Sequence, residues 1–594
     1  MSKREFTVAG EYQYNRSSPV RWIISHLLRH KRFAFGFMLL SIISQTLYSS
    51  ITVLTGQAFN AVLQGAYGQL VTIALTMLVI VFVEGCGDLG ARLSIQVLGT
   101  RFARDAREEL YISLLGKSQT FHNRQRVGDI MARASNDMEQ LSNMVVPAFD
   151  IIYDSYGSLV VILIFIGLLN PQLLLVPLLF TVCFFIALRQ YSRQLNPVSG
   201  AMREQFGETN VVLNEAVTGI EVVKATSQEE QEKLKFATRA SRYRDLYVKN
   251  GQIQGRYLPM LILGIFLALG FLHALYLLTH GQISLGTLVA FMALMGNLRF
   301  VTFMSLWSFS LVQLGFAGAK RVLEIMKEET DLDENESGHQ AGIQGDIVFD
   351  NVSFSYGTTP ILKNVSFRAR PGQTIAIVGQ TGSGKSTLTK MVNRIYDVNE
   401  GRVLIDGVDV RDWQLDSLRS QISTIEQDIF LFSRTISENI AYGLGQKADP
   451  IAIEEAAKDA QAHDFILGFK EGYETLVGER GVTLSGGQRQ RIAIARALLT
   501  DPRILILDDS TSAIDSATED EIQKAIKRVL EGRTTLLITH RLSQIRWADN
   551  ILVMKQGELI DQGSHEELLA RCDTYRRIFS HYDAAVPATA VGGE

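Results

Sequence analysis

Six long apolar stretches within the first 326 residues constrain the fold of this 594-residue chain more than any other feature. A helix of about 20 apolar residues spans the hydrocarbon core of a bilayer. The stretches lie, with ragged ends, at about 33–54, 70–95, 144–168, 171–189, 256–279 and 285–314. They predict a six-helix membrane domain over residues 19–326, preceded by a polar tail at 1–18.

The distribution of Lys and Arg predicts how these helices are oriented. The short connections near 56–70, 168–171 and 280–284 contain neither residue, whereas the N-terminus and the two long connections are rich in both. By the positive-inside rule, the N-terminus, the long connections and the C-terminal half are cytoplasmic. Helices two to five are then expected to extend well beyond the membrane. The polar N-terminus resembles no secretory signal, so insertion of this multi-pass cell-membrane protein is expected to depend on the internal apolar segments. The lack of an organelle-targeting extension favours a prokaryotic plasma membrane, with a eukaryotic origin as the alternative.

Ionisable residues inside the predicted spans require an explanation, because charge is costly in a bilayer. They are Glu84, Asp88, Arg92, Asp150, Asp154 and Arg299. For Glu84, Asp154 and Arg299 we expect either a polar lining for a translocation cavity or ion pairs within the bundle. For the other three, ion pairing or a position beyond the headgroups is favoured.

The composition changes after an acidic, Gly-rich linker at 327–345. Short β-branched segments at 346–583 predict an α/β domain, followed by a tail at 584–594 that we expect to be disordered. The net charge of −4 gives no indication of a nucleic-acid partner, and the three cysteines lie too far apart in sequence for a metal motif.

A phosphate-binding loop follows one of these predicted strands. GQTGSGKST fits G-x-x-x-x-G-K-S between a strand and a helix, which is the context that this motif requires. The predicted ATP-binding residues of the loop are Gly379, Gln380, Thr381, Gly382, Ser383, Gly384, Lys385, Ser386 and Thr387. Lys385 would neutralise the β- and γ-phosphates, and the Ser386 hydroxyl would bind Mg²⁺. The apolar run ILIL then delivers Asp508 to the same Mg²⁺.

The segment LSGGQRQRIAIARAL at 484–498 indicates the family. It stands about a hundred residues after the phosphate loop and shortly before ILILDD. In this order, and after six membrane helices, the chain resembles a half-transporter of the ABC exporter family, the multidrug and lipid exporter type. The resemblance covers about residues 19–582. It implies a six-helix membrane domain fused to an ABC-type P-loop ATPase that hydrolyses ATP to drive transport.

The resemblance also assigns roles to single residues. Tyr356 matches the aromatic residue that stacks on adenine, and Gln427 matches the glutamine that contacts Mg²⁺. His540 matches the histidine that contacts the γ-phosphate during hydrolysis, and Asp515 lies in a loop that crosses the dimer interface. The signature residues that would bind ATP held by a facing subunit are Ser485, Gly486, Gly487 and Gln488.

Three further segments resemble parts that join the two domains of such exporters. Glu479 lies in a loop, TLVGERG, that touches the intracellular helices in the family. Residues 121–137 and 208–225 resemble the first and second intracellular coupling segments. Solvated cytosolic helices are the alternative for both segments.

Asp509 departs from the family pattern, because this position usually carries the glutamate that orients or deprotonates the attacking water. Its side chain is one methylene shorter, and a misplacement of about 1 Å can slow a reaction ~10²-fold. In the family, this substitution is common in one half of heterodimers, where the intact signature completes the partner's site. The unbroken LSGGQ fits that role, although degenerate halves often lose the histidine that is retained here as His540.

Several alternatives remain at this stage. A homodimer hydrolysing ATP through Asp509 is one, and an ATP-gated channel or regulatory subunit on the same architecture is another. An ABC ATPase acting on nucleic acid is disfavoured by the six spans, and an importer by the fusion of both parts in one chain. The expected cargo is an amphipathic small molecule or lipid, with peptides still open.

Overall fold

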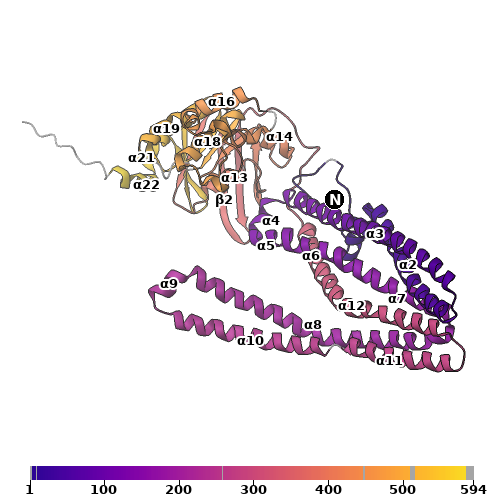
Figure 1. Cartoon of the computed structure of the whole chain (residues 1–594). Helices are drawn as coiled ribbons and strands as arrows, with labels where there is room; N and C mark the ends of the chain where they lie inside the picture. The colour runs from indigo at the N-terminus through magenta and orange to yellow at the C-terminus, as the bar shows by residue number, and fades with distance from the viewer. Residues whose placement is uncertain (1–2, 9, 257, 446–447, 509–515, 584–594) are drawn as a thin grey trace, which may run out of the picture. The chain divides into compact units, whose positions relative to one another are not determined.

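The computed structural model describes residues 3–8, 10–256, 258–445, 448–508 and 516–583. The chain divides into two compact units (Figure 1). The membrane unit comprises Tyr12–Tyr111 and Val127–Glu328. The sheet unit comprises Met1–Glu11, Ile112–Arg126 and Glu329–Glu594. Two segments from the N-terminal half of the sequence therefore belong to the sheet unit.

In the described part of the chain, six helical segments are long and apolar enough to cross a membrane, as the sequence predicts. They are Lys31–Leu63, Tyr67–Leu115, Val127–Leu169, Pro171–Thr218, Glu229–Thr279 and Leu285–Met304. Several far exceed the length that a bilayer requires, the second having 49 residues. The expected extensions are single continuous helices at Tyr67–Leu115 and Leu175–Thr218, whereas the third segment is interrupted at Val146, whose backbone is not helical.

The α-helices before residue 329 are α1 (Pro19–Arg29), α2 (Lys31–Leu63), α3 (Tyr67–Leu115), α4 (Gln119–Arg124), α5 (Val127–Ala132), α6 (Met138–Asn143), α7 (Asp150–Leu169), α8 (Leu175–Thr218), α9 (Ile220–Ala225), α10 (Glu229–Gly255), α11 (Leu258–Thr279) and α12 (Leu285–Lys327). Of these, α4 belongs to the sheet unit. Two π-helical turns, Arg133–Asp137 and Met144–Phe149, flank α6. A 3₁₀ turn at Pro171–Leu174 precedes α8.

One long helix pair and a group of helices around α12 organise the membrane unit. α8 and α10 run side by side and are joined by α9 at their tip (Figure 1). Gly219 separates α8 from α9. α12 packs against α2, α7 and α11, and a buried apolar core that includes Ile166, Phe180, Phe291 and Leu298 joins α7, α8 and α12. Close van der Waals packing of this kind holds the helices together, because the hydrophobic effect does not drive helices to associate within lipid.

A buried carboxylate holds α1 against α3. Glu109 accepts hydrogen bonds from Arg16 Nε at 2.6 Å, Trp22 Nε1 at 2.7 Å and His26 Nε2 at 3.0 Å. Trp22 and His26 are fully buried, and the ring of Tyr14 stacks on His26. A buried charge is tolerated only when it is paired and hydrogen-bonded in this way. The face of α1 that packs against the protein therefore includes a histidine as well as apolar residues.

The sheet unit contains two sheets. A four-stranded antiparallel sheet has the order β2-β1-β4-β5, and a six-stranded sheet has the order β10-β9-β3-β8-β7-β6. The strands are β1 (Ile347–Tyr356), β2 (Thr359–Ala369), β3 (Thr374–Gly379), β4 (Glu400–Ile405), β5 (Val408–Asp409), β6 (Ile422–Ile425), β7 (Ile504–Asp508), β8 (Thr534–Ile538), β9 (Asn550–Lys555) and β10 (Glu558–Gly563). Five strands of the larger sheet, β9, β3, β8, β7 and β6, are parallel.

Ten helices accompany these strands in the described residues from 329 to the C-terminus. They are α13 (Lys385–Lys390), α14 (Leu415–Arg419), α15 (Ile436–Ile440), α16 (Pro450–Asp459), α17 (His463–Leu467), α18 (Gly486–Leu499), α19 (Ser516–Leu530), α20 (Leu542–Ile545), α21 (His565–Arg571) and α22 (Asp573–Asp583). One apolar core lies between the two sheets and includes Phe349 and Ile377. A second lies on the other face of the larger sheet, where Leu507 packs with Ile494 of α18.

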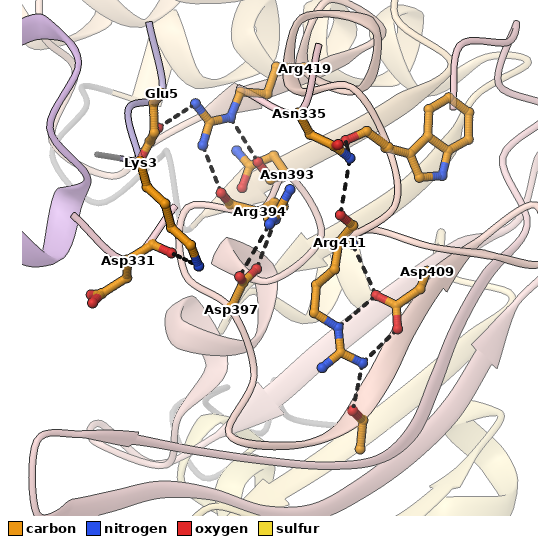
Figure 2. A network of polar contacts seen from close by, with 12 residues as sticks. Lys3, Glu5, Asp331, Asn335, Asn393, Arg394, Asp397, Asp409, Arg411 and Arg419 are labelled. Carbon is orange, nitrogen blue, oxygen red and sulfur yellow. Dashed lines mark hydrogen bonds and ion pairs between the residues drawn. The ribbon is translucent and has the colours of Figure 1, made fainter. Parts of the chain in front are cut away.

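An N-terminal strap, residues 3–8, is bonded to the sheet unit. Glu5 receives a 2.8 Å hydrogen bond from Arg419 Nη1, and its backbone N–H donates to Gly116 O at 2.9 Å. Figure 2 shows Arg419 between Glu5 and the carbonyl groups of Asn393 and Arg394. Further contacts join Arg4 and Thr7 to Glu334, and Lys3 to Asp331. The segment expected to be a polar tail therefore makes specific contacts.

Candidate nucleotide site and membrane cavity

The register of the parallel strands brings four predicted site segments to one edge of the sheet. Ile377 of β3 pairs with Ile538 of β8, which pairs in turn with Asp508 of β7. Since neighbouring strands lie about 4.8 Å apart, Asp508 and Ile377 are separated by about 10 Å. The phosphate loop leaves β3 two residues after Ile377, and His540 follows β8 by two residues. Ligands bind at such carboxyl ends in open α/β sheets.

Gln427 joins the same edge from the next strand. Ile425, the last residue of β6, pairs with Leu507, so Gln427 leaves the sheet two residues beyond that pair. Its side chain is exposed. The sequence predicted Gln427, Asp508 and His540 separately, and the strand order now gives a physical reason why they can act together.

The loop between β3 and α13 is shaped to hold a phosphate. Gly382 and Gly384 have φ of +79° and +96°, a region that other residues rarely adopt. A Cβ on Gly384 would also lie 2.9 Å from Leu362 Cδ2. Lys385 is buried and donates to the carbonyls of Gly379 and Gln380 at 2.8 and 3.0 Å. These bonds hold the ammonium group inside the loop, where it can neutralise an anion.

A buried hydroxyl also lies in the phosphate loop. Ser383 Oγ has no hydrogen-bond partner among the described residues, although Ser383 is buried. Such a group costs free energy unless a ligand or water completes it. Ser386 lies in the first turn of α13 and is half-buried. A hydroxyl can donate a hydrogen bond to a phosphate oxygen, and its own oxygen can bind Mg²⁺.

Tyr356 ends β1 and is partly exposed. The Tyr396 ring packs edge-on against it, with 5.3 Å between the ring centroids. Burial, followed by the neighbouring Tyr356, raises the pKa of Tyr396 to about 12. Tyr396 lies 40 positions after Tyr356 and outside every motif, so no local sequence pattern indicates its place beside Tyr356.

The signature segment forms the N-terminus of α18. Ser485 is the N-cap of this 14-residue helix, and its Oγ accepts from Gln488 N at 3.3 Å. Gln488 Oε1 accepts in return from Ser485 N at 2.9 Å. Ser485 is exposed, whereas Leu484 and Gly487 are buried. The capping box thus fixes a helix N-terminus that faces solvent, where backbone N–H groups can bind an anion.

Other predicted site residues have varied surroundings. Glu479 is exposed in a short 3₁₀ turn. In the first coupling segment, Phe121 is buried within α4. Asp137 at its end accepts bonds from Arg321 of α12. The second coupling segment ends α8 and forms α9, which buries no residue. Asp509 and Asp515 lie outside the described residues.

The membrane unit contains a cavity of about 710 Å³ whose walls carry all six intramembrane ionisable residues. For Glu84, Asp154 and Arg299, cavity lining was one of the two expected roles. Asp88, Arg92 and Asp150, for which ion pairing was favoured, share the cavity wall with them. Arg92 Nε does pair with Asp88 Oδ2 at 2.7 Å, and Arg92 Nη1 lies 3.8 Å from Asp150 Oδ2. Ion pairing and cavity lining are therefore combined in these residues.

A six-span unit and a parallel sheet with a phosphate loop at its edge define a membrane protein with a nucleotide-binding unit. Two family models match the chain: "ABC transporter" over residues 362–512 and "ABC transporter transmembrane region" over 34–302. The chain belongs to the ABC transporter family. Its fold class is confirmed, as is the combination of ATP hydrolysis with transport in one multi-pass membrane chain.

Relatives and a solved structure support this assignment over nearly the full length. The chain is 34% identical to an ATP-dependent lipid A-core flippase of Syntrophus aciditrophicus (strain SB), covering 92% of this chain and 91% of that protein. It is 34% identical to an uncharacterized ABC transporter ATP-binding protein of Bacillus subtilis (strain 168), with 85% and 87% covered. A bacterial Atm1-family ABC exporter solved with ATP bound aligns with a TM-score of 0.78 at 28% identity, covering 94% of this chain and 99% of that one.

Proposed function

We propose that this chain is one half of a dimeric exporter that uses ATP to move amphipathic small molecules or lipids across a plasma membrane by alternating access. The observation that carries the proposal is the convergence of the phosphate loop, Gln427, Asp508 and His540 on one sheet edge, in a chain that also has six spans. Its N-terminus and sheet unit are assigned to the cytoplasm by the positive-inside rule.

The need for a second subunit follows from the signature. Ser485 lies at an exposed helix N-terminus and has its own capping partner within the chain. In the proposed dimer, this terminus binds the γ-phosphate of ATP held on the facing subunit's phosphate loop. ATP then joins the two sheet units, and hydrolysis releases them. Asp515 is proposed to lie at this interface.

Mg²⁺ is the proposed companion of ATP. It commonly uses one or two carboxylates together with substrate phosphates. Asp508, Ser386 and Gln427 are the residues proposed to hold it, and the strand register supports their proximity to the loop. His540 is proposed to contact the γ-phosphate, and Tyr356 to stack on adenine.

The relatives support lipids as one class of cargo, since the Syntrophus protein is named a lipid A-core flippase. A flippase of Pseudomonas aeruginosa with the same name is 36% identical, covering 85% of this chain and 84% of that protein. The uncharacterized Bacillus protein is about as similar. That protein has no named cargo, so the relatives that do name one support a lipid cargo.

We further propose that the partner is a different chain. Asp509 replaces the usual glutamate and is expected to hydrolyse slowly, while the intact signature can complete a competent site on a partner. The retained His540 fits the alternative, a homodimer that hydrolyses ATP through Asp509.

Steady-state ATPase activity of this chain alone, purified into lipid, tests the proposal beside a Lys385→Ala control. Activity equal to that of the control, with ATP still bound by the unsubstituted chain, supports the heterodimer. Turnover of about 1 s⁻¹ or more would show that Asp509 suffices and that a homodimer works. Transport of a labelled amphipath against a gradient separates an exporter from an ATP-gated channel.

A further inference from the structure

Two routes of contact lead from Glu5 of the N-terminal strap to Tyr396. In the first, Glu5 Oε2 accepts a hydrogen bond from Arg419 Nη1 at 2.8 Å. Nε and Nη2 of the same guanidinium group donate to the carbonyls of Asn393 and Arg394 at 3.1 and 2.7 Å (Figure 2). Tyr396 follows Arg394 by two residues. Arg419 therefore connects the strap to the turn that leads into Tyr396.

The second route runs through Gly116 and α4. The Glu5 backbone N–H donates to Gly116 O at 2.9 Å, directly after α3 ends. The chain then forms α4, where the Asn123 amide donates to the Tyr396 hydroxyl at 2.7 Å. Both routes therefore end at the ring that packs against Tyr356, the residue proposed to stack on adenine. All of these residues belong to the sheet unit.

The strap fits closely against Gly116. A Cβ on Gly116 would lie 2.9 Å from Phe6 O and 3.4 Å from Arg4 Cβ, and the three atoms nearest to it all belong to the strap. Because the nearest atom is backbone, a side chain at this position requires the strap to move. Gly116 does not have a positive φ, so alanine causes no backbone strain there. This position therefore allows the strap to be displaced without a change of charge.

Mainly polar contacts hold the strap. Thr7 Oγ1 donates to Glu334 at 2.8 Å on the surface of the unit. Phe6 and Val8, the two apolar residues of the strap, are 41% and 39% exposed. Exposed polar pairs stabilise a structure only slightly, so the docked and released forms of the strap differ by a small free energy. A ligand that favours one of two such forms shifts the balance between them.

We propose that Glu5 and Arg419 are positioning residues of the nucleotide site. The docked strap holds Tyr396, and through it Tyr356, in the arrangement that binds the adenine of ATP. This role rests on the proposed stacking of Tyr356 and goes beyond the proposed function, because it couples the N-terminus to nucleotide binding. Coupling between two sites is reciprocal. The factor by which the docked strap strengthens ATP binding is therefore also the factor by which bound ATP favours docking.

Hydrogen exchange of the full chain in lipid nanodiscs tests this reciprocity. The Glu5 amide hydrogen, bonded to Gly116 O, reports docking in an N-terminal peptide that contains it. A non-hydrolysable ATP analogue at saturation should slow its exchange about fivefold, the low end of typical allosteric coupling. Lys385→Ala, which removes the ammonium group of the phosphate loop, should abolish this response at the same concentration of analogue.

Titration of the analogue measures the coupling from the other side. Gly116→Ala displaces the strap and should weaken the affinity about fivefold. Glu5→Ala interrupts only the route through Arg419 and should weaken it by a smaller factor. Gly342→Ala and Glu336→Ala are the matched controls in the same unit, and both should bind like the unsubstituted chain. A Cβ on Gly342 meets no described atom within 4 Å, and Glu336 is exposed.

Equal affinities of folded Gly116→Ala and the unsubstituted chain would overturn the proposal, with thermal melting used to verify folding. So would exchange of the Glu5 amide that does not respond to bound analogue, since a purely structural strap would behave in this way. The exchange measurement needs no substitution and decides even if Gly116→Ala does not fold. A chain that binds no nucleotide would contradict the proposed function itself, whereas unchanged affinity and exchange with intact binding contradict only the role of the strap.

Discussion

The Asn123 side-chain amide donates a 2.7 Å hydrogen bond to the Tyr396 hydroxyl, and Tyr396 packs against Tyr356. Two successive side-chain contacts therefore connect the first coupling segment, through Tyr396, to the Tyr356 ring that is proposed to stack on adenine. Asn123 is itself oriented by Gln119, which donates to its Oδ1 at 2.9 Å. All four residues belong to the sheet unit.

Removing this bond should weaken ATP binding. Asn123→Ala and Tyr396→Phe each delete it, and one hydrogen bond contributes about 0.5–1.5 kcal/mol, or roughly a two- to tenfold change in apparent ATP affinity. Because both variants remove the same contact, their effects should not add in the double variant. Nucleotide titration of the three variants measures this. Fully additive effects would show that Asn123 and Tyr396 act independently.

Restoring the glutamate should accelerate hydrolysis. Asp509→Glu lengthens the side chain by one methylene, and a gain of ~10²-fold is expected if the base is misplaced by about 1 Å. Steady-state ATPase activity of the chain alone measures the gain, and the double variant with Lys385→Ala should abolish it. Equal rates for Asp509→Glu and the unsubstituted chain would mean that side-chain length at this position is not limiting.

Glu109→Gln should destabilise the protein strongly. The carboxylate is buried and receives three donors, from Arg16, Trp22 and His26. Breaking a buried pair of this kind costs about 3–5 kcal/mol. Thermal melting in detergent should show the loss, whereas Glu108→Gln, an exposed neighbour, should melt like the unsubstituted protein. Similar melting of both variants would contradict a stabilising role for the cluster.

The pair formed by Asp409 and Arg411 should stabilise the sheet unit in a pH-dependent way. Arg411 Nη2 and Nε donate to Asp409 at 2.6 and 3.0 Å (Figure 2). Burial acts to raise the pKa of Asp409, but the hydrogen bonds from Arg411 outweigh it, and the resulting pKa lies below the usual value. The unfolded chain then binds this proton more readily, so the stabilisation is present above pH about 4 and is lost as the pH falls further.

Asp409→Asn should accordingly lower the melting temperature at pH 7, with a difference that shrinks below pH about 4. Asp412→Asn, at an exposed neighbouring acid, serves as the control and should show a much smaller difference. A difference between Asp409→Asn and the unsubstituted chain that stays constant from pH 7 to pH 3 would contradict the assignment to this carboxyl group.

Features with a local sequence signal could be predicted. The spans follow from the length of apolar runs, and the phosphate loop and the LSGGQ helix follow from residues that are adjacent in sequence. The side chains that meet at the sheet edge were identified one by one. Their convergence depends on strand order, because β7 and β8 lie between β6 and β3 in space but after both in sequence.

Features that depend on distant partners could not be predicted. Glu109 stands in TRFARDAREEL, which has the composition of a solvated helix, and only its contacts with residues more than 80 positions away reveal a buried charge. Asp88, Arg92 and Asp150 could be assigned to helix faces by their spacing. No local pattern indicates which face borders a cavity, because that depends on four helices packing together.

The strap has a consequence for the order in which the protein is completed during synthesis. Glu5 leaves the ribosome 414 residues ahead of Arg419. At about 5–20 residues per second, this delay amounts to roughly 20–80 s, during which all six spans emerge. For that period, residues 3–8 have no Arg419 to bind. A fragment that begins at residue 329 would lack both the strap and residues 112–126, so Arg419 and Tyr396 would each lose a bonding partner. The contacts of the sheet unit are therefore complete only after the strap, residues 112–126 and the segment from residue 329 have all been synthesised.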